Sequence, residues 1–305
     1  MSAGSLREVR ALVTGASGFL GSNLCRRLLD DGAEVHATSR SARTSDHPRL
    51  RWWQSDLASE GSARALLREI RPDVVFHLAG QVSAAPGLPL VQPAFHSLLG
   101  STVNLLGAVA QEGCRRVVLT GSLTEPWTDG PEVAPTSPYA AAKWASSAYA
   151  RMFHALYGTP VVILRPFMAY GPGQRAEKLV PHVILSLLDG TPPKLASGDF
   201  TADWIYVDDV IEGFARAASQ QGIEGATLDL GTGVMTSTRD LVRRIVARTG
   251  SRLEPEFGVV PDRPDEPLRS ADVGTAKERL GWQAQISLDD GIDRTIAWFR
   301  RQRIA

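Results

Sequence analysis

The sequence predicts an α/β protein in which a doubly wound parallel sheet is accompanied by a smaller C-terminal substrate-binding lobe. Short β-branched runs alternate with helical patterns up to residue 164. The runs are apolar throughout, which is typical of parallel strands covered by helices on both faces. Proline and glycine then become frequent, so we expect residues 1–164 to form the sheet domain and residues 165–305 mainly the lobe, interleaved with the sheet. A mixed α+β domain is the alternative.

Each expected strand precedes a helical stretch. The strands of the sheet domain are Ala11–Val13, Glu34–Thr38, Val74–Leu78, Val117–Thr120 and Val161–Leu164, and its helices are Ser22–Asp30, Gly61–Ile70, Ser97–Gln111 and Pro138–Tyr157. The lobe is expected to contain helices at Val180–Asp189 and Val207–Ala218, a strand at Thr227–Leu230, a proline-rich segment at Arg263–Pro267 and two terminal helices.

The composition limits the classes of partner. The 305 residues include 33 Lys and Arg against 33 Asp and Glu, and 43% are hydrophobic, enough for a sizeable core. Nucleic acids and anionic membranes select an excess of basic residues, so neither is expected as a partner. Cys25 and Cys114 are expected to be buried free thiols in a reducing compartment. The sequence shows neither a secretory leader nor a membrane-spanning run, so we expect a cytoplasmic protein.

Three glycines lie between the first strand and the first helix. Gly15, Gly18 and Gly21 allow a tight turn and a close approach of the backbone to a pyrophosphate at the start of the helix. The pattern predicts a Rossmann-like dinucleotide site, although the same glycines could serve the turn alone. The residues expected to bind the cofactor here are Gly15, Ser17, Gly18, Phe19, Leu20 and Gly21.

The end of the second strand bears on the choice of cofactor. An NAD site usually carries an acidic residue there, whereas this chain has Ser39, followed by Arg40 and Arg43. A hydroxyl and guanidinium groups suit a 2′-phosphate, so we expect NADP, with NAD as the alternative. The arginines could also be solvated loop charges. Asp56 and Leu57, which follow the next expected strand, are expected to contact the adenine. Leu78, Ala79 and Gly80, directly after His77, are expected to pass under the cofactor. No metal is expected.

Tyr139 and Lys143 are four residues apart in an alanine-rich helix that Ser137 and Pro138 begin, so both lie on one face. An ammonium group one turn away stabilises a phenolate and makes tyrosine a usable acid–base group. Ser122 follows the expected strand Val117–Thr120 and offers a hydroxyl that can hold the reacting oxygen. We expect Ser122, Tyr139 and Lys143 to be the catalytic residues, with Tyr139 and Lys143 also contacting the cofactor.

Taken together, these motifs resemble an extended short-chain dehydrogenase/reductase of the nucleotide-sugar epimerase/dehydratase family. The resemblance rests on the glycine loop, His77-Leu78-Ala79, the Ser122/Tyr139/Lys143 set, Leu164-Arg165-Pro166, Tyr170-Gly171-Pro172-Gly173, Asp203-Trp204-Ile205-Tyr206-Val207-Asp208-Asp209-Val210 and Leu280-Gly281-Trp282. It implies hydride transfer at a sugar carbon, a nucleoside diphosphate sugar as substrate, a cofactor contact at Pro166, and a homodimer through helices Ser97–Gln111 and Pro138–Tyr157.

The residues after Ser122 bear on the reaction. Similar 4,6-dehydratases carry Asp-Glu or Ser-Glu directly after the catalytic Ser or Thr. This chain has Leu123 and Thr124 at those two positions, and Glu125 follows one residue later. The N-terminal half also resembles GDP-4-keto-6-deoxymannose reductases, in Ala37-Thr38-Ser39-Arg40, Ile70-Arg71-Pro72-Asp73 and Gly121-Ser122 with a nearby Glu125. We therefore expect reduction of a nucleoside diphosphate 4-keto-6-deoxyhexose, with a 4-epimerase that keeps NAD tightly bound as the alternative. A dehydratase, a decarboxylase and a non-catalytic NADP-binding protein are less favoured.

The resemblance also implies where the substrate binds. The residues implied are Gln81, Ser122, Leu123, Thr124 and Glu125 around the sugar, Leu179 and Val180 beside the base, and Arg263, with Arg269, at the diphosphate. Two positions depart from the family pattern: Ala202 stands where an Arg is common, and Ser97 where an Asn is common.

Overall fold

The computed structural model describes residues 6–83, 85–126, 134–262 and 269–304, and the chain divides into two compact units. Unit 1 comprises Met1–Pro166, Ile211–Asp229 and Thr275–Trp282, and unit 2 comprises Phe167–Val210, Leu230–Gly274 and Gln283–Ala305. The chain thus leaves unit 1 after Pro166 and returns to it twice. The assignment of substrate binding to the second half of the chain stays a prediction.

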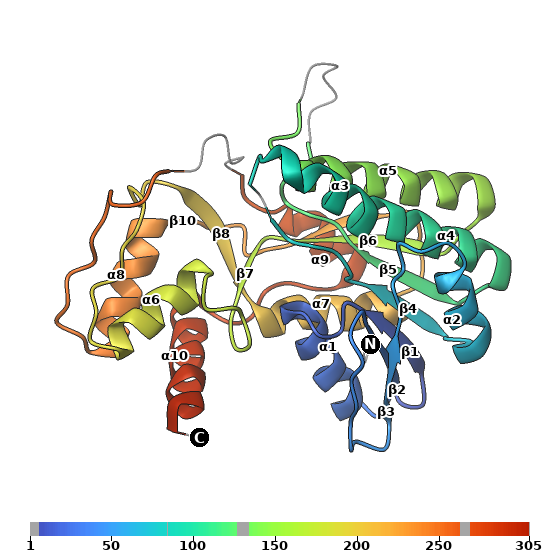
Figure 1. The fold of residues 1–305 in the computed structure, drawn as a ribbon, viewed down its shortest axis with the longest axis horizontal. Helices are drawn as coiled ribbons and strands as arrows, with labels where there is room; N and C mark the ends of the chain where they lie inside the picture. The colour runs from blue at the N-terminus through green and yellow to red at the C-terminus, as the bar shows by residue number, and fades with distance from the viewer. Residues whose placement is uncertain (1–5, 84, 127–133, 263–268, 305) are drawn as a thin grey trace. The chain divides into compact units, whose positions relative to one another are not determined.

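Unit 1 is built on a seven-stranded sheet in the order β3-β2-β1-β4-β5-β6-β9, and the strands from β3 to β6 pair in parallel (Figure 1). Its strands are β1 (Arg10–Thr14), β2 (Glu34–Ser39), β3 (Leu50–Gln54), β4 (Val74–His77), β5 (Arg116–Thr120), β6 (Val161–Pro166) and β9 (Thr227–Leu230). The order reverses between β1 and β4, the point at which doubly wound sheets bind ligands. The predicted Rossmann-like fold is confirmed.

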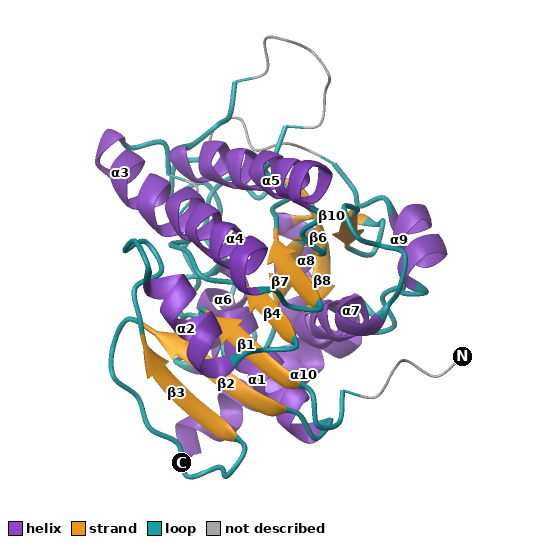
Figure 2. Cartoon of the chain, turned by 90° about the vertical axis from the view of Figure 1, so that its right-hand side faces the viewer, coloured by secondary structure: helices purple, strands orange, loops and turns teal. Residues whose placement is uncertain are grey.

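Helices cover both faces of this sheet, with α2, α4 and α5 on one side and α1 and α7 on the other (Figure 2). Their bounds are α1 (Phe19–Asp30), α2 (Ser62–Ile70), α4 (Ser101–Glu112), α5 (Pro138–Tyr157), α7 (Val207–Ser219, which begins in unit 2) and α9 (Val273–Leu280, which ends in unit 1). The central strands are apolar and fully buried, as Val74, Val75 and Phe76 of β4 illustrate. Double coverage thus explains the continuous apolar runs in the sequence.

The segment before α4 is less regular than the single helix expected from Ser97. A 3₁₀ turn at Leu88–Leu90 (η1), a short helix at Val91–Ala94 (α3) and a π-helical stretch at Phe95–Gly100 (η2) precede it. The Ser97 hydroxyl donates to the Pro93 carbonyl, and the Ser101 hydroxyl donates to the Ser97 carbonyl. Serine hydroxyls bonded back to carbonyls in this way loosen the regular pattern of a helix.

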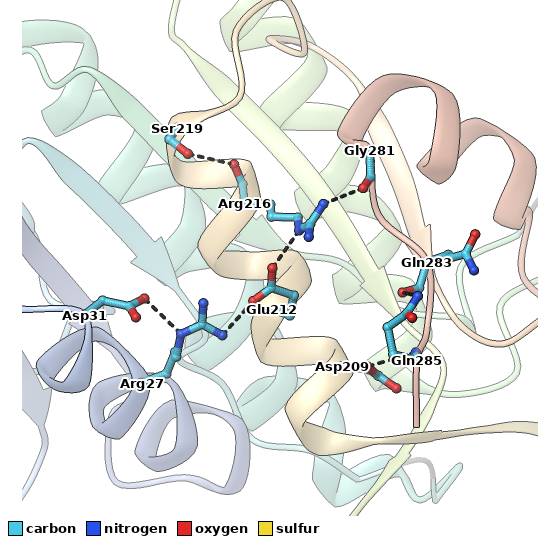
Figure 3. Close-up of polar contacts among 9 residues, drawn as sticks. All are labelled: Arg27, Asp31, Asp209, Glu212, Arg216, Ser219, Gly281, Gln283 and Gln285. Atoms are coloured by element: carbon cyan, nitrogen blue, oxygen red, sulfur yellow. Dashed lines mark hydrogen bonds and ion pairs between the residues drawn. The ribbon is translucent and has the colours of Figure 1, made fainter. Parts of the chain in front are cut away.

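Ion pairs join α1 to the unit 1 part of α7 (Figure 3). Arg27 bonds to Asp31 at 2.9 Å and to Glu212 at 2.6 Å, and Glu212 also accepts a bond from Arg216 at 2.6 Å. Arg216 in turn donates to the Gly281 carbonyl. Burial raises the pKa of Glu212, but the bonds from Arg216 and Arg27 outweigh this effect and lower it. The network therefore holds Glu212 ionised between two helices.

Both cysteines are free thiols, as expected, although only Cys25 is buried and Cys114 is half-buried. Burial raises the pKa of the Cys25 thiol to about 12 and that of Cys114 to about 11. Neither thiol is therefore ionised at neutral pH.

Unit 2 contains a three-stranded sheet in the order β10-β8-β7 that the sequence did not predict. Its elements are β7 (Met168–Tyr170), α6 (Leu179–Leu188), β8 (Thr201–Tyr206), β10 (Met235–Ser237), α8 (Thr238–Thr249) and α10 (Leu288–Ile304). The buried carboxylate of Asp203 on β8 accepts bonds from the backbone of Thr232, Gly233 and Ala271. It thereby fixes two connecting segments to the sheet. Among the described residues, no helix combines the length and apolar character needed to cross a membrane.

Candidate functional site

The glycine loop packs closely against the end of β4. Gly15 has a positive φ of 68°, and a Cβ at that position would lie 2.8 Å from the backbone of Ala79. Gly18 is the extended N-cap of α1, and no side chain in the described part of the chain caps it. The first N–H groups of α1 are therefore left to an outside acceptor, which suits the pyrophosphate of a dinucleotide.

A chain of hydrogen bonds holds the ends of β1 and β4 together beneath this loop. Thr14 Oγ1 bonds to His77 Nδ1 at 2.8 Å and accepts the backbone N–H groups of Leu78 and Ala79. His77 Nε2 lies 3.1 Å from Thr102 Oγ1, whose proton goes to the Leu98 carbonyl. The Nε2 atom of His77 must therefore carry the proton. Burial lowers the pKa of His77 to about 3, which agrees with a neutral ring that shapes the site but does not titrate.

The end of β2 lacks the acidic residue of a typical NAD site. Ser39 is half-buried and its Oγ accepts the backbone N–H of Ser41, while Arg40 is exposed. The Arg43 guanidinium lies over the Trp52 ring at 5.4 Å. A binding role for these residues, and their preference for NADP, stays a prediction.

Two further predicted cofactor residues lie after β3. The Asp56 carboxylate accepts the backbone N–H of Ala58, and the Leu57 side chain is buried in the apolar core of unit 1. Their contact with an adenine stays a prediction. Pro166 is buried at the end of β6.

The structure brings Ser122, Tyr139 and Lys143 together at the end of β5. Ser137 begins α5 by accepting the Ala140 N–H, so Tyr139 and Lys143 fall in the first two turns. The Lys143 ammonium donates to the Thr120 carbonyl at 2.6 Å, and the Ser122 hydroxyl bonds to Tyr139 and, at 2.9 Å, to Thr124 Oγ1. This geometry provides an acid–base phenol beside a hydroxyl and a buried cation.

Burial dominates the electrostatics of these groups. It raises the pKa of Tyr139, against the effect of the Ser122 hydrogen bond, and the Glu125 charge raises it further. This shift is opposite to the lowering expected from the ammonium group of Lys143, because burial outweighs it. Burial also lowers the pKa of Lys143 to about 8, against the attraction of Glu125. Lys143 is therefore mostly cationic at neutral pH, and its charge is lost only a little above it.

The substrate residues expected around the sugar differ in exposure. Gln81 is exposed, and Leu123 and Thr124 are half-buried. Glu125 is buried, and its carboxylate accepts a hydrogen bond from the Ser122 backbone N–H. These roles stay predictions. Sequence reasoning assigned no role to Arg165, which the structure places near Glu125, because a lone arginine in a strand carries no local signal of its partner.

The residues implied to bind the nucleotide belong to unit 2. Leu179 is half-buried and Val180 is fully buried in α6, and the Arg269 guanidinium lies over the Phe167 ring at 5.9 Å. Arg263 lies outside the described residues. In the ranges that the structure describes, no group of His, Cys, Asp and Glu side chains is arranged to hold a metal ion.

Comparisons with known proteins agree on one family. The family model described as "NAD dependent epimerase/dehydratase family" matches residues 11–231. A UDP-glucose 4-epimerase of Mycolicibacterium smegmatis is 36% identical, and the match covers 96% of this chain and 99% of the relative. A dTDP-glucose 4,6-dehydratase of Streptomyces griseus is 30% identical, and the match covers 96% of this chain and 94% of the relative. The crystal structure of the Bacillus cereus UDP-glucuronic acid 4-epimerase, in complex with UDP-glucuronic acid and NAD, matches with a TM-score of 0.85 and 26% identity over 96% and 99% of the two chains.

These matches bear on two expectations. They favour the 4-epimerase, the alternative reaction, over the 4-keto reductase, the reaction expected first. They also support NAD more directly than NADP.

Proposed function

Since the chain belongs to the NAD-dependent epimerase/dehydratase family, we propose that it is a UDP-hexose 4-epimerase that oxidises the sugar at C4 and reduces it again from the other face. The observation that carries the proposal is the Ser122, Tyr139 and Lys143 cluster beside a glycine loop with free helix N–H groups. Similarity over nearly the whole length of a UDP-glucose 4-epimerase supports the choice of reaction.

The residues have distinct roles in this reaction. NAD, held at the Gly15–Gly21 loop, supplies the hydride acceptor when it is bound. The Tyr139 oxygen takes the proton of the C4 hydroxyl as the C4–H bond breaks, and returns it when the opposite epimer forms. Ser122 holds the reacting oxygen by a hydrogen bond, and Lys143 stabilises the phenolate of Tyr139.

Elimination of water is less well supported, because a dehydratase needs an acid and a base beside the sugar. Leu123 cannot serve as either, and Thr124 is a poor acid–base group. Glu125 is the carboxylate nearest in sequence, but it is only 3% exposed and accepts the Ser122 N–H at 2.7 Å. It is thus engaged inside the protein.

A second candidate is reduction of a nucleoside diphosphate 4-keto-6-deoxyhexose with NADPH. The observation that favours it is Ser39 at the end of β2, where no carboxylate would repel a 2′-phosphate. Tyr139 would then donate its proton to the forming alkoxide.

The cofactor and the reaction are tested together. The purified protein is denatured, the released nucleotide is identified by chromatography, and the native protein is incubated with UDP-glucose while UDP-galactose is followed by NMR. Bound NAD and interconversion without added cofactor support the epimerase. An empty site with oxidation of added NADPH by the 4-keto sugar would replace it with the reductase.

We also propose that two copies associate through α5 and its neighbours. Large apolar side chains are exposed on these elements, at Phe95, Trp144, Tyr149, Leu156 and Tyr157. Light scattering should give twice the chain mass, and Trp144→Glu should lower it. Cytoplasmic location, expected from the free thiols, is part of the proposal and is checked by fractionating cells.

A further inference from the structure

The side chain of Glu125 is buried beside the catalytic groups, and the proposed reaction gives it no part. Its Oε1 atom accepts the Ser122 N–H at 2.7 Å, and the residue is 3% exposed. A Cβ on Gly121 would lie 2.7 Å from this Oε1 atom and 2.8 Å from Cγ of Arg165. The turn after β5 is therefore shaped closely around the carboxylate.

Charged groups face Glu125 from two elements. Lys143 on α5 and Arg165 on β6 both attract it, and its charge raises the pKa of Tyr139 and of Lys143. Burial raises the pKa of Glu125 itself, against the effects of the Ser147 hydroxyl on α5, the Ser122 N–H and these two cations. Arg165 Nε also donates at 2.8 Å to Asp229 on β9, which is almost fully buried. The charges thus alternate from Asp229 through Arg165 and Glu125 to Lys143.

A buried carboxylate is costly even when it is paired, and an apolar side chain would fill the same space without that cost. Although Ser147 and Arg165 also act on Glu125, two of its interactions reach catalytic groups: its hydrogen bond fixes the backbone that carries the Ser122 hydroxyl, and its charge lies near Tyr139 and Lys143. The neutral ring of His77, which faces Lys143 from β4, adds no competing charge.

We propose that Glu125 is a positioning residue, which holds Ser122 in place through its backbone and sets the protonation of the Tyr139–Lys143 pair through its charge. This inference rests on the proposed hydride-transfer function of the same site. The charge keeps Lys143 cationic and favours the phenol form of Tyr139. Removing the charge while keeping the contact should therefore make both groups lose their protons at lower pH.

Two substitutions separate the contact from the charge. Glu125→Gln keeps an oxygen that accepts the Ser122 N–H but removes the charge, whereas Glu125→Asp keeps the charge but withdraws the oxygen by one methylene. We expect both limbs of the pH profile of kcat/KM to move to lower pH in Glu125→Gln. In Glu125→Asp we expect the limbs to stay in place while kcat falls about 100-fold, the cost of a misplaced catalytic group.

A matched control removes a carboxylate elsewhere in unit 1. Glu224 pairs at 2.5 Å with Arg116, which begins β5, at the opposite end of the strand from Ser122. Glu224→Gln should leave the limbs of the profile unmoved. Circular dichroism and thermal unfolding show whether each variant is folded.

A second measurement does not depend on turnover. The tyrosinate absorbance of the NAD-loaded protein is titrated with alkali, and subtraction of the Tyr139→Phe protein isolates Tyr139. In the Glu125→Gln background this titration should move to lower pH. If it moves but no sugar turns over, the epimerase proposal fails and the Glu125 proposal stands. Coincident titrations in the two backgrounds, or an unchanged kcat in folded Glu125→Asp, would overturn it.

Discussion

Gly21 provides a sharp test of how tightly the cofactor loop is packed, because it lies within α1 in an ordinary helical conformation. Only the available space forbids a side chain there. A Cβ would be nearest to the Gly15 carbonyl oxygen and 2.7 Å from Cα of Ala16, whereas ordinary contact begins at 3.4 Å. The atoms that would have to move belong to the backbone of the loop, which would shift by about 0.7 Å or more.

Two opposing effects determine how much Gly21→Ala changes the free energy of unfolding. Alanine is favoured over glycine in a helix by about 1 kcal/mol, and overpacking a rigid site costs about 1–3 kcal/mol, more where backbone must move. We therefore expect a net loss of about 2 kcal/mol in unfolding free energy. The displaced loop should also weaken NAD binding at least about tenfold, which corresponds to roughly 1.4 kcal/mol.

Gly107 in α4 is the matched control, because nothing lies within 4 Å of a Cβ placed there. Gly107→Ala should gain about 1 kcal/mol from helix propensity and leave NAD binding unchanged. Urea unfolding gives the two stabilities, and calorimetric titration with NAD gives the affinities. If Gly21→Ala is as stable as Gly107→Ala and binds NAD as tightly, the loop is not packed as described.

Three other predictions concern the site. Tyr139→Phe should lower kcat about 100-fold to 10,000-fold while calorimetry shows unchanged NAD binding; unchanged turnover would remove the phenol from the mechanism. Burial lowers the pKa of Lys143 to about 8, so its charge is present below that pH and lost above it. The rise of kcat/KM with pH that the ionisation of Tyr139 produces should therefore level off above about pH 8, a break that Lys143→Arg should lack. Ser39→Asp should weaken NADP binding about tenfold or more relative to NAD, because a carboxylate repels the 2′-phosphate; equal effects on both affinities would place the ribose elsewhere.

Local signals explain which elements could be predicted. Helix α5 has the predicted bounds because Ser137 and Pro138 begin it and Gly158, with a φ of 65°, ends it. The strand at Thr227–Leu230 was also predicted with its observed bounds. The strands β7 and β10 have only three residues each, too few for a periodicity to appear. The six residues of β8 are buried almost throughout and include Asp203, so no alternation marks that strand, and the small sheet of unit 2 was missed.

The glycine loop and the Tyr139–Lys143 spacing could be predicted because each depends on residues within one or two turns, and the doubly wound fold could be predicted because each strand and helix of the alternation carries its own local pattern. The surroundings of Ser122 could not be predicted, because they depend on how distant segments pack. Glu125, Arg165 and Asp229 are far apart in the chain, and their charges meet because β5, β6 and β9 lie in one sheet. Burial of Tyr139 and Lys143 where α5 packs on η2, α4 and β6, which no local pattern specifies, is what perturbs their pKa values.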